Sequence, residues 1–353
     1  MKIVLTGGGT AGHVTPNIAL LPELQKQGYD VHYIGSYTGI ERGLISQCGV
    51  RYYGISSGKL RRYFDLRNVT DIFRIIKGLG ESVSLLRRIR PDIVFSKGGF
   101  VVVPVALAAH LLGIPVVIHE SDITPGLATK LVMPFAKTVC TSFPETLKYV
   151  PEGKGVLTGS PIRPSLWEGS RREGMKLCGF DRLPVKPVIL VTGGSLGAAA
   201  INRCVFEILP RLLERFYIVH LCGKGNIRED SRPGYAPFEY AQEEMPHLLA
   251  AADMVISRAG ANTLFELLAL GKPNLLIPLS KAASRGDQIL NAASFEGQGY
   301  SMVLQEEDMR AESLYDAILA LYASRTEYAK RMDGGKVGEG VKKVVEEIGR
   351  VVK

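Results

Sequence analysis

The sequence predicts an α/β protein made of two Rossmann-like domains that follow one another along the chain. Short apolar, strand-like runs alternate with amphipathic helical patterns throughout its 353 residues, which is typical of parallel sheets covered by helices on both faces. A pattern of strand, glycine loop and helix occurs at residues 2–27 and begins again at residue 188. The chain is also long for a single hydrophobic core, so two domains are expected.

The first half is expected to begin with a strand at 2–6 and to alternate from there. Residues 100–118 are nearly all apolar and long enough to resemble a membrane span. Pro104 suits a helix start, however, and Gly113 with Pro115 suits a helix end, so we interpret the run as a buried helix, a turn and a buried strand. The other expected elements are helices at about 16–27, 39–47 and 69–90 and strands at 31–34, 52–55, 93–96, 116–119 and 138–141.

The second half begins with a strand at 188–192 and the glycine loop GGSLGA. The boundary between the two domains is expected near 158–164, where glycine and proline residues favour turns over helix or strand. We therefore predict a first domain at 1–160, a second at 161–336 and a last helix at 337–353 with valines at helical spacing. Further expected elements are strands at 217–221, 254–257 and 274–277 and a helix near 312–323.

Composition and charge narrow the classes of protein. With 46% hydrophobic and 22% charged residues the chain is globular, and a net charge of +8 indicates an anionic partner such as nucleotide phosphates, nucleic acid or a membrane surface. Five scattered cysteines without C-x-x-C spacing argue against disulfides or zinc and fit a reducing cytosol. The sequence contains no Walker A motif and no RNA-binding aromatic signature, so no nucleic-acid partner is predicted.

The segment from Lys59 to Lys77 combines basic and aromatic residues. Its lysines and arginines suit anionic head groups, while Tyr63, Phe64 and Phe73 suit the membrane interface. The alternative is an ordinary solvated helix that turns its aliphatic residues into the core. The aliphatic residues in question are Val69, Ile72, Ile76, Leu79 and Val83.

The first glycine loop, GGGTAGHVTP at 7–16, formally fits the dinucleotide pattern G-x-G-x-x-G. A dinucleotide site also has an acidic residue at the end of the second strand. Here that strand ends at Ser36 and the next acidic residue is Glu41, which disfavours a nicotinamide oxidoreductase. A purely structural turn is the other interpretation, but His13 is expected at a helix N-terminus on the carboxyl edge of the sheet, where ligands of such folds bind.

Three motifs of the second half suit a nucleotide sugar. GGSLGA places Ser195 and backbone N–H groups at a helix N-terminus, which favours a diphosphate. Glu266 comes about two turns into the next candidate helix, where it could hold a ribose or simply complement the helix dipole. Gln288 could read sugar hydroxyls, or its segment could be only a helix cap that contains Asp287.

The motif HESD at 119–122 puts a histidine and two carboxylates at the end of a strand. Glu120 is therefore a candidate general base, although a surface turn explains the motif equally well. The sequence contains no D-x-D pattern of the kind that bridges a metal ion and a diphosphate. We predict neither a metal nor a cofactor.

Taken together, these motifs resemble the MurG family, the peptidoglycan glycosyltransferases that add N-acetylglucosamine to lipid I. The resemblance implies the GT-B architecture: two Rossmann-like domains facing across a cleft, with the donor mainly in the second, the acceptor mainly in the first, and the C-terminal helix crossing back to the first. It covers essentially the whole chain. The motifs that carry it, in order, are GGGTAGHVTP, KGGF, HESD, TGSPIR, GGSLGA, RAGANTLFE and DQILNA.

The resemblance also implies roles for single residues. His13 matches a functionally important histidine, Glu266 matches a ribose contact, and Gln288 matches a residue that reads hydroxyls of N-acetylglucosamine. The full set of implied substrate-binding residues is Thr10, Ala11, Gly12, Asp122, Arg163, Ser195, Ala261, Asn262, Thr263, Leu264, Phe265, Glu266 and Gln288. The chain departs from the usual family pattern at Ala11, Val103, Asp122 and Asp287.

The reaction implied is an inverting transfer from UDP-N-acetylglucosamine to the muramic acid 4-hydroxyl of lipid I, which makes a β-1,4 link and gives lipid II. The hydroxyl needs a general base, for which His13 is favoured over Glu120, because the unperturbed pKa of histidine, about 6.5, is close to working pH. Lipid I implies a peripheral enzyme at the cytoplasmic face of the bacterial membrane. The sequence does not indicate any protein partner. The alternative is a UDP-N-acetylglucosamine 2-epimerase of the same architecture, which would leave the segment from Lys59 to Lys77 unexplained.

Overall fold

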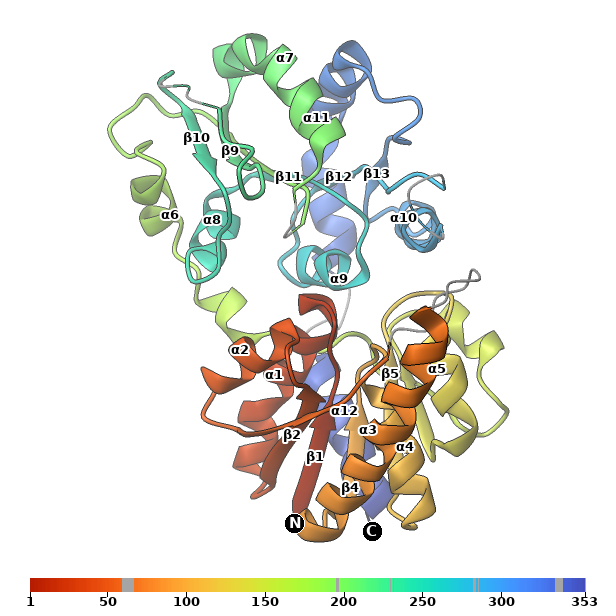
Figure 1. Cartoon of the computed structure of the whole chain (residues 1–353). Coiled ribbons are helices and arrows are strands. Elements are labelled where there is room, and N and C mark those ends of the chain that lie inside the picture. Colours follow the sequence, from red (N-terminus) through yellow and green to blue (C-terminus); the bar gives the residue numbers. More distant parts are fainter. Residues whose placement is uncertain are drawn as a thin grey trace. The chain divides into compact units, whose positions relative to one another are not determined.

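The chain folds into two compact units, which a computed structural model describes except at residues 59–66, 195–196, 229, 231, 282–283, 285, 334–338 and 353 and at the side chains of 67–70 and 333 (Figure 1). The first unit comprises Met1–Arg163 and Gly338–Lys353, and the second comprises Pro164–Val337. Each unit contains its own parallel β-sheet with helices packed against it. The α/β fold predicted from the alternating pattern is confirmed.

In the described part of the first unit, seven parallel strands form a sheet in the order β3-β2-β1-β4-β5-β6-β7. The strands are β1 Lys2–Thr6, β2 Asp30–Ser36, β3 Arg51–Ile55, β4 Ile93–Ser96, β5 Val116–Glu120, β6 Thr138–Thr141 and β7 Gly155–Leu157. The helices are α1 Ala11–Lys26, α2 Ile40–Ser46, α3 Arg67–Ile89, α4 Val102–Leu111, α5 Leu127–Val132 and α12 Gly340–Val352, with short 3₁₀ helices η1 Met133–Phe135 and η2 Pro144–Tyr149.

The second unit repeats this plan with six described parallel strands in the order β10-β9-β8-β11-β12-β13. The strands are β8 Val188–Thr192, β9 Tyr217–Leu221, β10 Tyr235–Phe238, β11 Met254–Ser257, β12 Asn274–Leu276 and β13 Met302–Val303. The helices are α6 Arg171–Leu177, α7 Ala199–Arg215, α8 Met245–Ala251, α9 Ala261–Ala269, α10 Asp287–Gly297 and α11 Ala311–Asp333, with the 3₁₀ helix η3 Pro164–Glu168.

Each sheet is buried because its strands are apolar on both faces, as parallel sheets require. In the first unit α3, α4 and α5 contribute to the core on one face, while α1 and α12 contribute to the core on the other. Val344, Val345 and Ile348 of α12 are fully buried in that second core. In the second unit α7 and α11 lie together on one face of the sheet (Figure 1).

The apolar run at 100–118 forms the buried helix α4, a turn and the buried strand β5, as predicted. No helix in the described part of the chain is long and apolar enough to cross a membrane. Two predicted boundaries were wrong. The helix α1 begins at Ala11 and not near residue 16, so Pro16 lies inside the helix, and α11 ends at Asp333 and not near residue 323. The glycine loop leads directly into α1, which places His13 in its first turn.

Candidate active site

Three loops of the first unit meet at the carboxyl edge of its sheet. Strands β1, β4 and β5 are neighbours in parallel register, with Thr6 paired to Ser96 and Ser96 paired to Ile118. The segments that follow these strands are the first glycine loop, KGGF at 97–100 and HESD at 119–122. Because parallel strands end at one edge, motifs far apart in sequence are brought side by side, at the position where such sheets bind ligands.

The glycines of KGGF allow this loop to pack against the first glycine loop. The Gly8 N–H donates to the carbonyl oxygen of Gly98 at 3.3 Å. Gly99 has a φ of +87°, and a Cβ at this position would collide with the Gly8 carbonyl. A Cβ at Gly98 would lie 3.3 Å from the His13 ring. Glycine at both positions therefore places the KGGF backbone directly against His13.

His13 is half-buried and oriented by the loop that precedes it. Its Nδ1 lies 2.9 Å from the Gly8 carbonyl oxygen and 3.3 Å from Thr10 Oγ1. A ring nitrogen that contacts a carbonyl oxygen must carry the proton, since a carbonyl only accepts. In the neutral imidazole, Nε2 is then the basic nitrogen.

Lys97 is a site residue that the sequence did not single out. It is only 2% exposed, and its ammonium group donates to the Ser121 hydroxyl. Burial lowers the pKa of Lys97 to about 8, and the neighbouring carboxylates of Glu120 and Asp122 oppose part of that shift. Its position in the KGGF motif was visible in the sequence, but its partner, 24 residues away, was not.

Glu120 holds the backbone of the turn that follows β5. One carboxylate oxygen accepts the N–H groups of Ser121 and Asp122 at 2.8 and 3.1 Å, and the other accepts the Gly126 N–H at 3.0 Å. His119 is also buried, and its Nε2 lies 2.9 Å from the Gly159 carbonyl oxygen. Burial, together with the Lys97 charge, lowers the pKa of His119 well below its usual value, so this ring is neutral.

The other predicted site residues of the first unit lie around these loops. Thr10 directly precedes α1, and Ala11 and Gly12 are the first residues of that helix. The Asp122 carbonyl oxygen accepts the Thr146 hydroxyl at 3.1 Å, which fixes the end of HESD. Arg163 ends the first of the two chain segments that make up the first unit. The predicted site residue of the second glycine loop, Ser195, lies outside the described residues.

In the second unit, α9 starts at the carboxyl edge of the sheet directly after β11. Ala261, Leu264 and Phe265 are buried, and Phe265 packs edge-on against Phe295. The side chains of Leu264 and Phe265 thus belong to the core, which the motif alone did not indicate. The members of RAGANTLFE that remain partly exposed on this helix are Asn262, Thr263 and Glu266.

Gln288 lies in the first turn of α10, and its side-chain oxygen accepts the Leu279 N–H at 3.0 Å. This bond fixes the side chain against the segment that follows β12. Asn291 is fully buried one turn later and donates to the Ala259 carbonyl oxygen at 3.3 Å. The motif DQILNA therefore connects α10 to the loops that follow β11 and β12.

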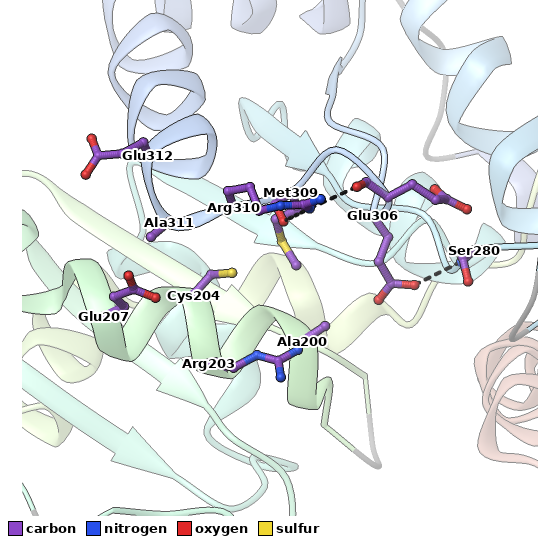
Figure 2. A pocket seen from close by; sticks show the side chains of 11 residues that line it. Ala200, Arg203, Cys204, Glu207, Ser280, Glu306, Met309, Arg310, Ala311 and Glu312 are labelled. Atoms are coloured by element: carbon purple, nitrogen blue, oxygen red, sulfur yellow. Dashed lines mark hydrogen bonds between the residues drawn. The ribbon is translucent and has the colours of Figure 1, made fainter.

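A cavity of about 740 Å³ lies in the second unit, lined by α7 and by the segments after β12 and β13 (Figure 2). Glu306, in its wall, accepts the Ser280 N–H at 3.0 Å and pairs with Arg258. Burial acts to raise the pKa of Glu306, but the bonds from Arg258 and Ser280 outweigh it and lower that pKa. This ion pair ties together the ends of β11, β12 and β13. The sequence did not reveal it, because its members are 48 residues apart.

Fold and site together define the class of protein: two α/β units whose glycine loops lie at the carboxyl edges of parallel sheets, which is the position where such folds bind ligands. Family models agree with this class. The glycosyltransferase family 28 N-terminal domain matches residues 3–141, and the glycosyltransferase family 28 C-terminal domain matches residues 188–348. The chain belongs to glycosyltransferase family 28.

Similar proteins and solved structures cover the whole chain. A Clostridium botulinum protein, 56% identical over 100% of this chain and 99% of its own, is named UDP-N-acetylglucosamine–N-acetylmuramyl-(pentapeptide) pyrophosphoryl-undecaprenol N-acetylglucosamine transferase. A Lachnospira eligens protein of the same name is 59% identical over 98% of this chain and 97% of its own. The crystal structure of Acinetobacter baumannii MurG is 28% identical with a TM-score of 0.75, and covers 99% of both chains.

A UDP-GlcNAc 2-epimerase from Neisseria meningitidis is also similar in structure, with a TM-score of 0.69 over 99% of this chain and 100% of its own. At 16% identity this similarity shows a shared fold and nothing about activity.

Proposed function

We propose that this protein transfers N-acetylglucosamine from UDP-N-acetylglucosamine to the 4-hydroxyl of the N-acetylmuramyl unit of lipid I, giving lipid II for peptidoglycan synthesis. The observation that carries the proposal is the 56% identity, over the whole chain, to proteins named for this transfer. The position of His13 supports the proposal independently. The ring lies against the first glycine loop and the KGGF loop, at the edge of the sheet where such folds bind ligands.

In this reaction the acceptor hydroxyl attacks the anomeric carbon on the face opposite to UDP. A bond forms between that carbon and the acceptor oxygen, the bond to the diphosphate oxygen breaks, and the anomeric configuration inverts. His13 takes the hydroxyl proton at Nε2, which is the basic nitrogen when Nδ1–H contacts the Gly8 carbonyl. Backbone N–H groups of the second glycine loop and the Arg163 guanidinium stabilise the charge that grows on the departing UDP.

The geometry favours His13 over Glu120 as the base. Both Glu120 oxygens accept backbone N–H groups, three in total, and the side chain is only 7% exposed. Taking up a proton would weaken those bonds and loosen the turn between β5 and α5. We therefore assign Glu120 to holding the loop and His13 to proton transfer.

We assign the donor to the second unit. The partly exposed side chains of Asn262, Thr263 and Glu266 suit the nucleoside, with the Glu266 carboxylate on the ribose hydroxyls. Leu264 and Phe265, whose side chains are in the core, would contribute through their backbone. Gln288 would read hydroxyls of the transferred sugar through its amide nitrogen, since its oxygen accepts the Leu279 N–H. Ser195 is assigned to the diphosphate side.

A lipid-linked acceptor requires the enzyme to act at a membrane surface, and α3 carries an exposed patch that suits membrane binding. Ile72, Phe73 and Ile76 are 49%, 69% and 60% exposed, beside the exposed cations Arg74 and Lys77. The alternative, that the aliphatic residues of this segment turn into the core, holds for Leu79 and Val83 but not for the exposed Ile72 and Ile76. Residues 59–66 of the same segment lie outside the described residues. We propose that this patch holds the enzyme on the cytoplasmic face of the membrane.

The test is UDP release from UDP-N-acetylglucosamine with and without a short-chain lipid I analogue, for the native chain and for His13→Ala. Release that requires the acceptor and falls about a hundredfold or more in the variant supports the transferase with His13 as base. Release that ignores the acceptor contradicts the transfer and favours an epimerase or hydrolase. Acceptor-dependent release that survives in the variant contradicts the role of His13.

A further inference from the structure

Glu41 is a fully buried carboxylate beneath the first glycine loop, and the mechanism above gives it no part. Its Oε2 accepts the Gly9 N–H at 3.2 Å. Its Oε1 accepts the Ser36 N–H at 2.9 Å and the Ser36 hydroxyl at 2.5 Å. All three bonded groups are donors, so the carboxylate form of Glu41 matches its surroundings completely.

Glycines make room for this carboxylate. A Cβ at Gly8 would lie 2.6 Å from the Glu41 carboxyl group, and one at Gly35 would lie 2.8 Å from the Glu41 side chain. A Cβ at Gly39 would come closer still to the carboxylate oxygens. The first glycine loop, the end of β2 and the start of α2 therefore surround a space that fits the Glu41 carboxylate.

The peptide bond between Gly8 and Gly9 connects this carboxylate to His13. In a trans peptide the C=O and N–H groups point in opposite directions, and every peptide bond in the described chain is trans. The N–H of this peptide donates to Glu41 on one side, and its carbonyl lies 2.9 Å from His13 Nδ1 on the other. A peptide whose N–H is bound to a carboxylate is also a better acceptor at its oxygen, since linked hydrogen bonds polarise one another.

We propose that Glu41 is a positioning residue for the transfer: through the Gly8–Gly9 peptide it orients and polarises the His13 ring. This inference rests on the proposed function, because it concerns the base of the same reaction. The carboxylate fixes the peptide, the peptide carbonyl holds the proton on Nδ1, and Nε2 is kept as the basic nitrogen. Glu41 thus does through one peptide what a carboxylate does in a direct carboxylate–histidine pair.

The test is Glu41→Gln, which keeps the size of the side chain and changes one acceptor atom into a donor. The amide oxygen is expected to remain with Ser36, where two donors meet it, so the new NH₂ group faces the Gly9 N–H. We expect kcat to fall about tenfold or more while KM for UDP-N-acetylglucosamine stays within about twofold, because the donor is assigned to the second unit. A KM that rises with kcat unchanged would contradict the proposal.

A double-mutant cycle separates positioning from general damage. If Glu41 acts through His13, then Glu41→Gln costs nothing further in a His13→Ala background, since the group it positions is gone. If Glu41→Gln lowers kcat by the same factor in the native chain and in His13→Ala, the proposal is overturned. This holds even when the native chain is fully active and His13→Ala has lost activity. Loss of acceptor-dependent release in the native chain would instead contradict the transferase itself, so the two failures are distinguishable.

The matched control is Glu81→Gln, in the same unit. The Glu81 carboxylate also accepts a backbone N–H at the end of a strand, that of Ser56 at 2.6 Å, but in the described part of the chain no hydrogen bond joins it to the glycine loop. Thermal stability should fall in both variants, whereas only Glu41→Gln should lose kcat. Nitrogen NMR of the His13 ring gives a direct readout: Nδ1–H in the native chain, and a mixture of tautomers in Glu41→Gln. An unchanged His13 spectrum would contradict the proposal.

Discussion

The two glycine loops of this molecule have the same place in the order of elements of their units, but residues of opposite charge follow the neighbouring strands. Each follows the first strand of its unit and leads into a helix, α1 or α7. Each helix carries a buried asparagine: Asn17 donates to the Thr6 carbonyl oxygen at 3.3 Å, and Asn202 donates to the Cys222 carbonyl oxygen at 2.8 Å. These amides satisfy backbone groups at the sheet edge, which buried polar atoms require.

The charge placed beside each loop differs. In the first unit the carboxylate of Glu41, in the first turn of α2 after β2, points inward and accepts the Gly9 N–H. After the corresponding strand β9, the second unit has Cys222, Gly223 and the exposed cation Lys224, and a Cβ on Gly197 of its loop would meet Cys222 and Gly223. We infer from this difference that the carboxylate beside the first loop suits a proton acceptor such as His13, and that the cation beside the second loop suits a diphosphate.

The largest effect is expected from Gly99→Ala, which breaks the packing of the first loop. The added Cβ meets the Gly8 carbonyl, and a φ of +87° strains any side chain at this position. We expect a loss of roughly 3 kcal/mol of unfolding free energy and a fall of at least about tenfold in kcat. Urea unfolding and acceptor-dependent UDP release measure the two effects. Native behaviour in both assays would refute the contact between the loops.

The paired variants Asn17→Ala and Asn202→Ala compare the two helices. Each removes a buried amide and leaves backbone or side-chain partners unsatisfied, at a cost of about 1 to 3 kcal/mol. Asn17 also donates to Tyr33 and to the His13 carbonyl, so Asn17→Ala should lower kcat as well. Asn202 instead holds His220 at 3.0 Å and the Cys222 carbonyl oxygen at 2.8 Å, beside the loop assigned to the diphosphate, so Asn202→Ala should destabilise the chain with a smaller effect on kcat than Asn17→Ala. A larger loss of kcat in Asn202→Ala than in Asn17→Ala would contradict the roles assigned to the two loops.

Acid should destabilise the second unit through His220. Burial lowers the pKa of His220 to about 4, against about 6.5 in the unfolded chain. The unfolded state then binds the proton more readily than the folded state. The free energy of unfolding is therefore highest above pH 6.5 and decreases as pH falls towards 4, by about 2 kcal/mol between pH 7.5 and pH 5. The midpoints of urea unfolding at pH 7.5 and at pH 5 measure this loss of stability. His220→Gln should flatten that pH dependence, and an unchanged slope would contradict the burial of a neutral ring.

The smallest effect is expected from Lys224→Glu, which makes the charge beside the second loop resemble that beside the first. Because Lys224 is exposed, we expect KM for UDP-N-acetylglucosamine to rise only about threefold at low salt, with the difference fading as salt is added. Lys224→Gln is the control and should show about half of the change. A change in kcat alone would argue against a diphosphate at this loop.

Much of the fold could be predicted from the sequence because the buried strands carry continuous apolar runs. Strands β4, β6, β8, β9 and β11 have the predicted bounds. The edge strands β7, β10 and β13 were missed, since strands of two to four residues with half-exposed patterns give little periodic signal. The start of α1 was placed too late because Pro16 suggested a helix N-terminus.

Local patterns and ordered motifs were enough to predict the two α/β repeats, the glycine loops, the position of His13 and the resemblance to one family of glycosyltransferases. What each carboxylate binds became visible only in the folded chain. Glu41, which follows β2, reaches Gly9 across 32 residues, and Glu120 turns both oxygens to backbone N–H groups. Such pairings depend on strand order and side-chain direction at the sheet edge, and no spacing in the chain encodes these two properties directly.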